Sequence, residues 1–292
     1  MKHRAGFTLI ELLVVIAILS LLVSIVLPAL KGARIQAQMA VCLANLNGLS
    51  KGYHAYADNH DSKLVNGDVP RYPGQQGLDL RTLGTRPPYW ADCPQDESYH
   101  YMGEPSQVPC PPTLEHKKLG IMRGALYDYA GDPAVYHCPG DLSRLLVPNG
   151  LGGQDSNPYA ENYSYRSYSV SDLLNAWNPT QDRRAAKKMT EIVTPSSKFV
   201  FIESTDNRGW LMGSWNFLME RTPPQSDTLA IWHRKRSGFG FADGHGEIHT
   251  WTDPDIIAAA ADPKRTWFSY TNTSSDDYRF LVRGYIPGRN IK

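Results

Sequence analysis

The carboxylate of Glu11 lies in a run of residues that is otherwise uncharged and mostly apolar, from Phe7 to Leu30. As a helix this run would be about 36 Å long, which is enough to cross a hydrocarbon core about 30 Å thick. A carboxylate inside a membrane span costs on the order of 2.5–3.5 kcal/mol. No side chain from Thr8 to Ile18 is basic. The chemistry expected of Glu11 is therefore an ion pair with a cation that comes from elsewhere.

Four cysteines, Cys42, Cys93, Cys110 and Cys138, are the next residues that can do chemistry. They form no Cys-x-x-Cys pair, and their wide spacing does not favour a zinc site. Disulfides are expected instead if this part of the chain lies outside the cytoplasm. Four cysteines allow three pairings, and spacing does not choose among them. We favour Cys42 with Cys138 and Cys93 with Cys110, the second of which would close a short loop in a Pro-rich region.

A polar group of residues lies near the C-terminus. The segment from His233 to Trp251 predicts a β-hairpin, with a type I′ turn at Asp243-Gly244 whose central residues both need positive φ. Its turn and return strand carry oxygen and imidazole ligands, namely Asp243, His245, Glu247 and His249. A polar turn and an exposed strand face account for the same residues, so we predict no metal site from them.

Composition limits the possible functions. The chain has 292 residues and a formal net charge of +1, which fits one or two domains and gives no reason to expect nucleic acid as a partner. Outside the N-terminal segment it is polar and rich in Gly, Pro and Tyr, as in a loop-rich globular head. The sequence contains no HExxH, P-loop or GxGxxG motif, so we do not expect an enzyme.

Three interpretations of the N-terminal segment compete. A basic start with Lys2 and Arg4, an apolar run and small residues near 29–33 fit a cleaved signal peptide. The same run fits a plain single-span anchor whose short basic end stays in the cytoplasm. Neither explains Glu11, and the third interpretation rests on a resemblance to a known family.

The residues Gly6-Phe7-Thr8-Leu9-Ile10-Glu11, followed by the uninterrupted run with Pro28, resemble the leader of type IV prepilins and type II secretion pseudopilins. The resemblance implies that the prepilin peptidase removes residues 1–6, cutting between Gly6 and Phe7, and that Phe7 is then N-methylated. Glu11 would pair with the Phe7 amine of a neighbouring subunit, and Thr8 and Pro28 are expected to take part in the same assembly. The desolvation cost of the carboxylate is then offset only when a partner subunit is present.

The same resemblance implies a location and a set of partners. We expect a single-pass protein of the bacterial inner membrane, with a cytoplasmic N-terminus and a head that is periplasmic or carried on an extracellular filament. Its partners would be other pilin or pseudopilin subunits, the prepilin peptidase, an inner-membrane assembly platform and the lipid bilayer.

The elements that position these residues follow from the apolar pattern. We predict a leader at 1–6, a transmembrane helix at 7–30, an amphipathic spine helix at 31–58 and a head at 59–292. The spine helix rests on a stripe with steps of 4 and 3, made of Ile35, Met39, Cys42, Leu46, Leu49, Tyr53 and Tyr56. We expect a kink at Pro28 and Gly32, and a helix end in the turn-prone residues 58–61.

The fold class expected for the head is α+β and pilin-like, with the spine helix on an antiparallel sheet and long loop insertions such as 67–112. We predict a helix within 119–130 and strands within 135–141, 162–174 and 196–205. The last strand, with Val200 and Ile202 on one face and Phe199 and Phe201 on the other, should lie inside the sheet. In the C-terminal hairpin, small residues share one face and should let the spine helix approach closely, namely Gly238, Gly240 and Ala242.

His233 and the pair Asp243-Gly244, separated by nine residues, resemble a C-terminal signature of a large family of bacterial prepilin-like proteins. Cys138-Pro139 resembles a further element of that family. Because major pseudopilins bind calcium in a C-terminal loop, four carboxylates of this region are weighed as ligands, namely Asp253, Asp255, Asp276 and Asp277. They form no recognised calcium loop, so no cofactor is predicted beyond this candidate.

The function predicted from the sequence is that of a structural subunit of a type II secretion pseudopilus or a type IV pilus-like filament. The alternative is a membrane-tethered protein that uses the prepilin leader for export and anchoring and whose head binds glycans or another surface ligand. Sixteen Tyr and seven Trp could line such a surface, although aromatic residues also anchor irregular loops.

Overall fold

The computed structural model describes residues 9–67, 69, 89–92, 94, 97, 113–141, 165–175, 184–205, 214–262 and 267–288. Several residues singled out in the sequence lie outside these ranges, namely Gly6, Phe7, Thr8, Cys93 and Cys110. Most of the predicted insertion at 67–112 also lies outside them.

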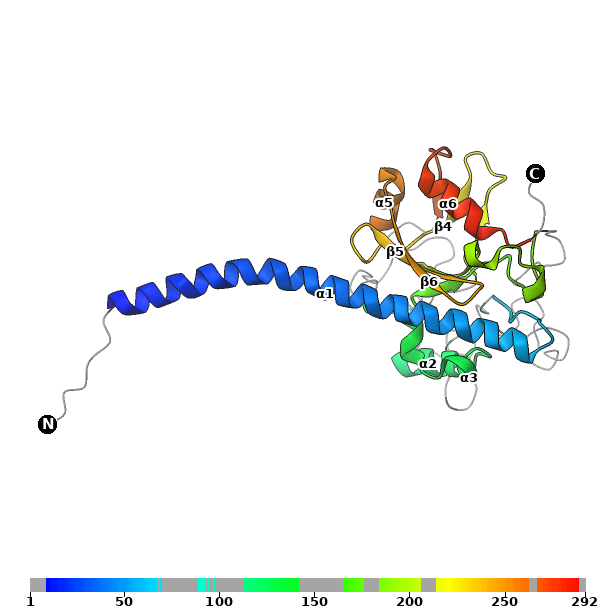
Figure 1. Ribbon diagram of the computed structural model, residues 1–292, viewed down its shortest axis with the longest axis horizontal. Helices are drawn as coiled ribbons and strands as arrows, with labels where there is room; N and C mark the ends of the chain where they lie inside the picture. Colours follow the sequence, from blue (N-terminus) through cyan, green and yellow to red (C-terminus); the bar gives the residue numbers. More distant parts are fainter. Residues whose placement is uncertain are drawn as a thin grey trace.

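One long helix, α1 (Leu9–Asn59), extends far beyond the head (Figure 1). It passes through Pro28 without interruption and curves gently, so the expected kink is not a break in the helix. A proline removes one backbone donor, which bends a long helix without ending it. The helix ends within the predicted residues, where Asp61 and Ser62 adopt positive φ of 54° and 63°.

Only the C-terminal half of α1 enters the head. Its buried residues are Cys42, Leu46, Leu49, Ser50, Gly52, Tyr53, Tyr56 and Ala57. This confirms the predicted apolar stripe from Cys42 onward, whereas Ile35 and Met39 are only partly covered. The apolar stripe thus finds its cover in the same chain.

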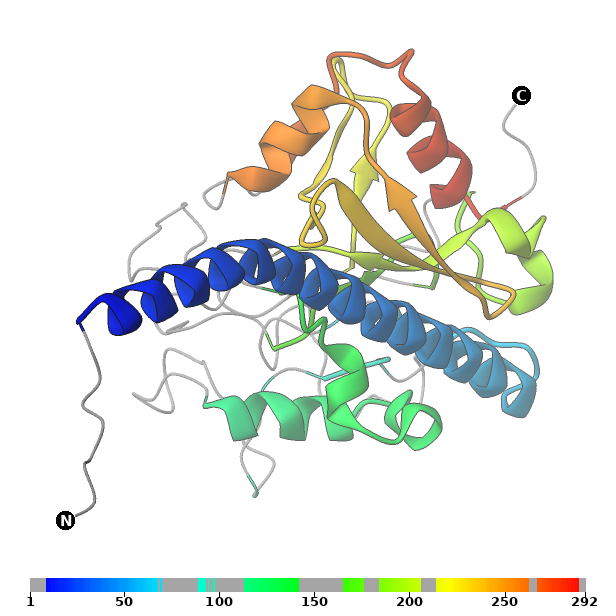
Figure 2. The same ribbon diagram turned by 60° about the vertical axis from the view of Figure 1, so that its left-hand side comes forward.

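The main sheet has four antiparallel strands in the order β1 (Tyr168–Val170), β2 (Phe199–Glu203), β5 (Arg236–Phe241) and β6 (Gly246–Thr250). The helix α1 crosses one face of it, as Figure 2 shows, and α5 (Pro254–Ala261) and α6 (Asp276–Tyr285) lie on the other side. This is the predicted α+β arrangement of a long N-terminal helix on an antiparallel sheet.

Glycines in β5 allow α1 to lie directly against the sheet. A Cβ at Gly238 would come within 2.4 Å of Leu46 Cδ1, and one at Gly240 within 2.3 Å of Ser50 Oγ. Real Cβ atoms do not approach other atoms so closely, so a side chain at either position would have to displace Leu46 or Ser50 of α1. The predicted close approach of the helix to the small face of the hairpin is confirmed.

The strand β2 separates two hydrophobic cores. Phe201 contacts Tyr53 of α1, with ring centroids 5.9 Å apart, whereas Phe199 packs against Phe239 and Phe280 on the other side. The prediction that Phe199 and Phe201 share a face is therefore wrong. The register of β2 against β5 shifts between Phe199 and Phe201, and such a bulge reverses the facing of residues on its two sides. The interior position of β2 was predicted correctly.

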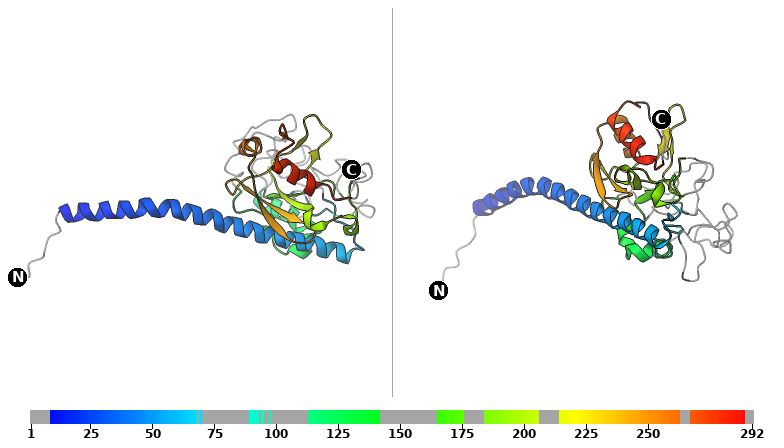
Figure 3. Two further views of the ribbon diagram at one scale, coloured as in Figure 1. Left: turned by 45° about the horizontal axis from the view of Figure 1, so that its top comes forward. Right: turned by 45° about the vertical axis from the view of Figure 1, so that its right-hand side comes forward.

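A second sheet of three short strands, β3 (Phe217–Leu218), β4 (Gln225–Asp227) and β7 (Trp267–Ser269), adjoins the second core. It was not predicted. Figure 3 shows these strands on the same side of the main sheet as α5 and α6.

On the opposite side of α1, the helices α2 (Leu114–Met122) and α3 (Tyr127–Ala130) replace the single helix predicted within 119–130 (Figure 1). The strand predicted from residue 135 is wrong. The chain there forms the 3₁₀ helix η2 (Pro133–Tyr136), because Pro133 starts the turn and the Asp132 carboxylate caps the N–H of Ala134. Two further 3₁₀ turns, η3 (Met189–Glu191) and η4 (Pro195–Ser197), precede β2.

The turn between β5 and β6 differs from the predicted type I′ turn. Of its residues, Gly244 alone has positive φ, +95°. The N–H of Phe241 donates to His245 O and the N–H of Gly244 to Phe241 O. This pattern is a three-residue hairpin loop with a glycine in the left-handed region. A side chain at Asp243 is accommodated because its own φ stays negative.

Candidate functional site

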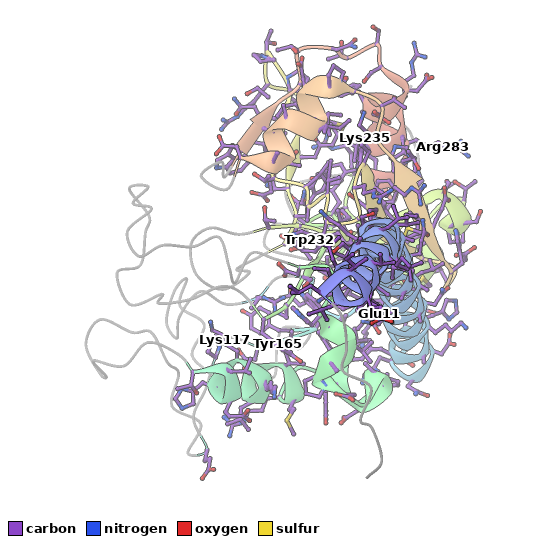
Figure 4. The ribbon with its side chains drawn as sticks, turned by 90° about the vertical axis from the view of Figure 1, so that its left-hand side faces the viewer. Glu11, Lys117, Tyr165, Trp232, Lys235 and Arg283 are labelled. Atoms are coloured by element: carbon purple, nitrogen blue, oxygen red, sulfur yellow. A yellow bond between two sulfur atoms is a disulfide. The ribbon has the colours of Figure 1, made fainter. Side chains whose placement is uncertain are left out.

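The N-terminal half of α1 is an apolar surface that the head does not cover. From Leu9 to Leu30 none of the residues is buried, and the large apolar side chains are 45–86% exposed. Figure 4 looks along α1 from its N-terminal end, with Glu11 near the viewer and the head behind. We call residues 9–30 the assembly segment. Within the described part of the chain, α1 is the one helix whose length and composition would allow it to cross a membrane.

The polar groups of the assembly segment are few. The hydroxyls of Ser20 and Ser24 donate to backbone carbonyls of their own helix, at 2.7 Å each. They therefore need no hydrogen-bond partner from lipid, water or another chain. Glu11, exposed near the start of α1, is its one charged side chain. The segment therefore presents apolar surface with a single carboxylate, which suits lipid or another apolar helix and not water.

The sequence of this segment matches known proteins. A family described as the prokaryotic N-terminal methylation motif matches residues 1–27. The chain is 35% identical over 72 residues to the competence protein ComGC of Halalkalibacterium halodurans, a match that covers 25% of this chain and 71% of that protein. The chain belongs to the prepilin-like proteins.

A second relative of this prepilin-like protein is the type IV wide pilus major component PilA4 of Thermus thermophilus, 41% identical over 66 residues. That match covers 23% of this chain and 50% of the relative, so the chain spans about half the length of PilA4. No solved structure shows significant similarity to the chain.

A covalent bond holds α1 to the head of the prepilin-like protein. Cys42 of α1 forms a disulfide with Cys138, which follows η2, and their Cα atoms are 5.3 Å apart. Both residues are fully buried. This is the pair favoured from the sequence, whereas Cys93 and Cys110 lie outside the described residues. The bond fixes the head at the point where α1 enters it.

Two ionisable side chains, His233 and Glu203, lie beside this disulfide. His233 Nε2 lies 3.2 Å from the sulfur of Cys42 and 3.2 Å from that of Cys138. The same nitrogen lies 3.6 Å from Glu203 Oε1 at the end of β2. We call Cys42, Cys138, Glu203 and His233 the joint cluster. Its four ligand-type atoms lie within 4.8 Å of one another, and all four residues are buried.

Backbone groups close the joint cluster. The N–H of Gly238 donates to Glu203 Oε2 at 2.9 Å, and the N–H of Gly140 donates to Cys138 Sγ at 3.3 Å. Burial raises the pKa of the Glu203 carboxyl, against the lowering effects of His233 and the Gly238 N–H. A Cβ at Gly140 would come within 2.5 Å of His233 Cε1, so glycine is needed for the ring to fit. The cluster is thus a buried polar site between α1 and the sheet.

The residues of the C-terminal signature, His233 and Asp243-Gly244, lie at the two ends of the contact between β5 and α1. His233 belongs to the joint cluster beside Cys42, and the β5 strand that follows it lies against α1. At the other end of the signature, a Cβ at Gly244 would lie 3.4 Å from Lys51 Cγ. Asp243 Oδ1 accepts hydrogen bonds from the backbone and side chain of His245, which stabilises the turn. The signature therefore fixes both ends of β5 relative to α1. Glu203 was missed, although a single carboxylate closing the apolar strand FVFIE was a visible signal.

The four aspartates considered for calcium serve other contacts. Asp277 accepts hydrogen bonds from the N–H groups of Asp253 and Thr252 at 2.6 and 2.7 Å and from the side chains of Thr252 and His249. Asp253 caps the N-terminus of α5. Asp276 pairs with Arg279, and Asp255 accepts from Thr271. Across the described residues these four aspartates form no convergent set of metal ligands, and neither do the residues of the β5–β6 hairpin.

Proposed function

We propose that this prepilin-like protein is a structural, non-enzymatic subunit of a type II secretion pseudopilus or a type IV pilus-like filament. In this proposal the assembly segment first anchors the protein in the inner membrane and later forms the filament core. The uncovered apolar surface of residues 9–30 is the observation that carries the proposal. In water this surface would be costly at about 25 cal/mol per Å², so it requires lipid or neighbouring subunits.

The proposal assigns a role to the residues around the start of α1. The prepilin peptidase would cut between Gly6 and Phe7, and N-methylation would follow at Phe7. The new Phe7 amine of one subunit would pair with Glu11 of its neighbour, and an assembly platform in the inner membrane would supply subunits to the growing filament. The match of the methylation motif to residues 1–27 supports this assignment.

Mass spectrometry of the protein isolated from its native membranes tests the processing step. The expected N-terminal peptide begins at Phe7 and carries one extra methyl group. Intact Met1–Gly6 in the membrane-bound protein would contradict processing at this bond, and a terminus beyond Leu30 would show a cleaved signal peptide instead.

Substitution of Glu11 tests assembly. In the Glu11→Ala variant we expect the protein to reach the membrane but to yield few or no filaments in electron micrographs, because the neighbouring amine loses its partner. Glu115→Ala is the matched control, since it removes an exposed carboxylate whose contact is with Lys118 of the same helix. Filaments in normal number from the Glu11→Ala variant would overturn the proposed pairing.

A further inference from the structure

The joint cluster has a composition that a disulfide alone does not require. A disulfide between α1 and the head needs two cysteines, yet an imidazole and a carboxylate are buried against the sulfurs. We propose that, when Cys42 and Cys138 are reduced, the joint cluster binds one Zn²⁺ ion. The metal then replaces the disulfide as the link between α1 and the head. This proposal does not depend on filament assembly.

The distances from His233 Nε2 to the other three ligand atoms suit a tetrahedral ion. With Zn–S bonds of about 2.3 Å and Zn–N and Zn–O bonds of about 2.0–2.2 Å, neighbouring ligand atoms are roughly 3.3–3.8 Å apart. His233 Nε2 lies 3.2 Å from each sulfur and 3.6 Å from Glu203 Oε1. The two sulfurs are bonded to each other in the disulfide, and they are the pair that must separate after reduction.

Two buried atoms lack the hydrogen bonds that their burial would demand. Among the described residues, neither Glu203 Oε1 nor His233 Nδ1 has a hydrogen-bond partner. A buried unsatisfied polar atom typically costs about 1–3 kcal/mol. For Oε1, which points into the joint cluster, a cation would remove this cost. His233 Nδ1 would keep its proton while Nε2 binds the metal.

The charges of the reduced cluster also favour a cation. Two thiolates and one carboxylate together carry three negative charges in a buried site, and a divalent ion leaves a net charge of −1. The N–H groups of Gly238 and Gly140 donate to Glu203 Oε2 and Cys138 Sγ and would hold these two ligands in place. Binding would release one proton from each thiol, so the affinity should rise with pH.

The four ligands come from distant parts of the chain: α1, the segment after η2, the end of β2 and the segment before β5. They meet only when the head folds around α1. Because all four are buried in the folded head, the binding energy of the ion would stabilise that fold. The disulfide and the metal use the same sulfurs, so the two states exclude each other.

Cobalt binding tests the proposal on the full chain in detergent micelles. A background carrying Cys93→Ser and Cys110→Ser leaves only the thiols of the joint cluster. After reduction with a phosphine in the absence of oxygen, Co²⁺ should bind at one ion per chain. It should give the intense visible bands of tetrahedral cobalt together with thiolate-to-cobalt charge transfer, and Zn²⁺ should displace it. The oxidised protein should show neither band. A reduced, folded protein that binds no Co²⁺ and no Zn²⁺ would overturn the proposal.

Variants identify the ligands. His233→Ala and Glu203→Gln should each alter the cobalt spectrum and weaken Zn²⁺ binding by at least about 10-fold, since both remove a direct ligand. His54→Ala and Glu115→Gln, which change exposed residues of the same types, should leave both readouts unchanged. Unchanged spectrum and affinity in the two ligand variants would also contradict the proposal.

Measurements on the reduced Cys93→Ser, Cys110→Ser protein keep the test valid if a ligand variant does not fold. X-ray absorption of the zinc-loaded protein should give two sulfur and two nitrogen or oxygen neighbours. Zinc at 100 times its Kd should stabilise the reduced fold by about 2.7 kcal/mol, seen as a higher Tm. A first shell without sulfur, or a Tm that zinc does not change, would contradict binding at the joint cluster.

Discussion

Asp277 shows how one carboxylate can stabilise the C-terminal part of the head. It lies at the start of α6 and accepts hydrogen bonds from the segment that leads into α5. Burial alone would raise the pKa of its carboxyl. The N–H groups of Asp253 and Thr252, together with the side chains of His249 and Thr252, outweigh burial and hold that pKa below its ordinary value. The ionised form is therefore the one that stabilises the fold.

The Asp277→Asn variant should lower the free energy of unfolding by about 1–3 kcal/mol at pH 7, because a buried acceptor of several hydrogen bonds is weakened. A carboxyl with a depressed folded-state pKa stabilises above its unfolded pKa of about 3.9, and this contribution is lost as pH falls through the folded pKa. The difference between variant and parent should thus shrink below about pH 4. Denaturant unfolding of the head across pH measures it.

Asp276→Asn is the control for this prediction. The Asp276 carboxylate is exposed and pairs with Arg279, and such surface ion pairs contribute about 0–1 kcal/mol to stability. A loss of stability in Asp276→Asn as large as in Asp277→Asn would show that the charge near α6, and not the buried hydrogen bonds, matters.

Three residues of the joint cluster were singled out in the sequence, and the fourth was not. Cys42, Cys138 and His233 stood out by type or spacing, but Glu203 belonged to an apolar strand. The approach of the hairpin to α1 was predicted, but no pattern in the sequence placed Glu203 and His233 beside Cys42, from which His233 is separated by 191 positions. Their meeting depends on β5 lying against α1 with its glycine face inward, a contact between elements and not a local pattern.

At the scale of elements, the contact between α1 and β5 depends on the absence of side chains at two positions. Gly240→Ala should lower the free energy of unfolding by about 1–3 kcal/mol, because its Cβ would come within 2.3 Å of Ser50 Oγ and 3.4 Å of Leu46 O, so that the buried Ser50 side chain must shift in a closely packed contact. Thermal or denaturant unfolding measures the change.

Gly48→Ala is the matched control, because Gly48 belongs to α1 but faces η2 and not β5. The nearest atom to its added Cβ is Val135 Cγ1 at 3.7 Å, an ordinary contact, and alanine favours a helix over glycine by roughly 0.5–1 kcal/mol. It should therefore leave the stability of the head unchanged or increased. A destabilised Gly48→Ala and an unaffected Gly240→Ala would contradict the proposed packing.

Elements with a local, periodic pattern were predicted from the sequence, and most of the other elements were not. The stripe on α1 and the alternation of the β5–β6 hairpin repeat over many residues. The bulge in β2 and the 3₁₀ helix η2 are decided by one or two residues. The helices α5 and α6 have strong caps at Asp253 and Ser275 that could have been recognised. The strands of the second sheet have two or three residues each, too few to carry a pattern.

At the scale of the whole molecule, the disulfide closes a loop with a sequence separation of 96 between α1 and the head. Cross-links over loops of this length stabilise by about 2–5 kcal/mol, chiefly through the unfolded chain. Reduction without added metal should lower the Tm of the head, and the Cys42→Ser, Cys138→Ser double variant should show the same loss without any reductant. An unchanged Tm in the double variant would contradict a stabilising role.

Only the part of α1 that lies in the head contributes to the stability of the head. No residue of α1 before Cys42 is buried, so the assembly segment adds nothing to either core of the described head. A chain beginning at Ala33 should therefore fold into a soluble monomer, as seen by light scattering and near-ultraviolet circular dichroism. Oligomers or an unfolded chain from this variant would show that residues 9–30 take part in the fold of the head.

A chain beginning at Gly52 is the control for this division. It lacks Leu46 and Leu49, each worth about 1.5–3 kcal/mol of burial, and the disulfide, worth about 2–5 kcal/mol. These losses approach the whole free energy of unfolding of a typical domain, about 5–15 kcal/mol. This shorter chain should be unfolded under conditions in which the chain from Ala33 is native. Both chains lack the assembly segment, so their difference isolates the buried half of α1 as part of the head itself.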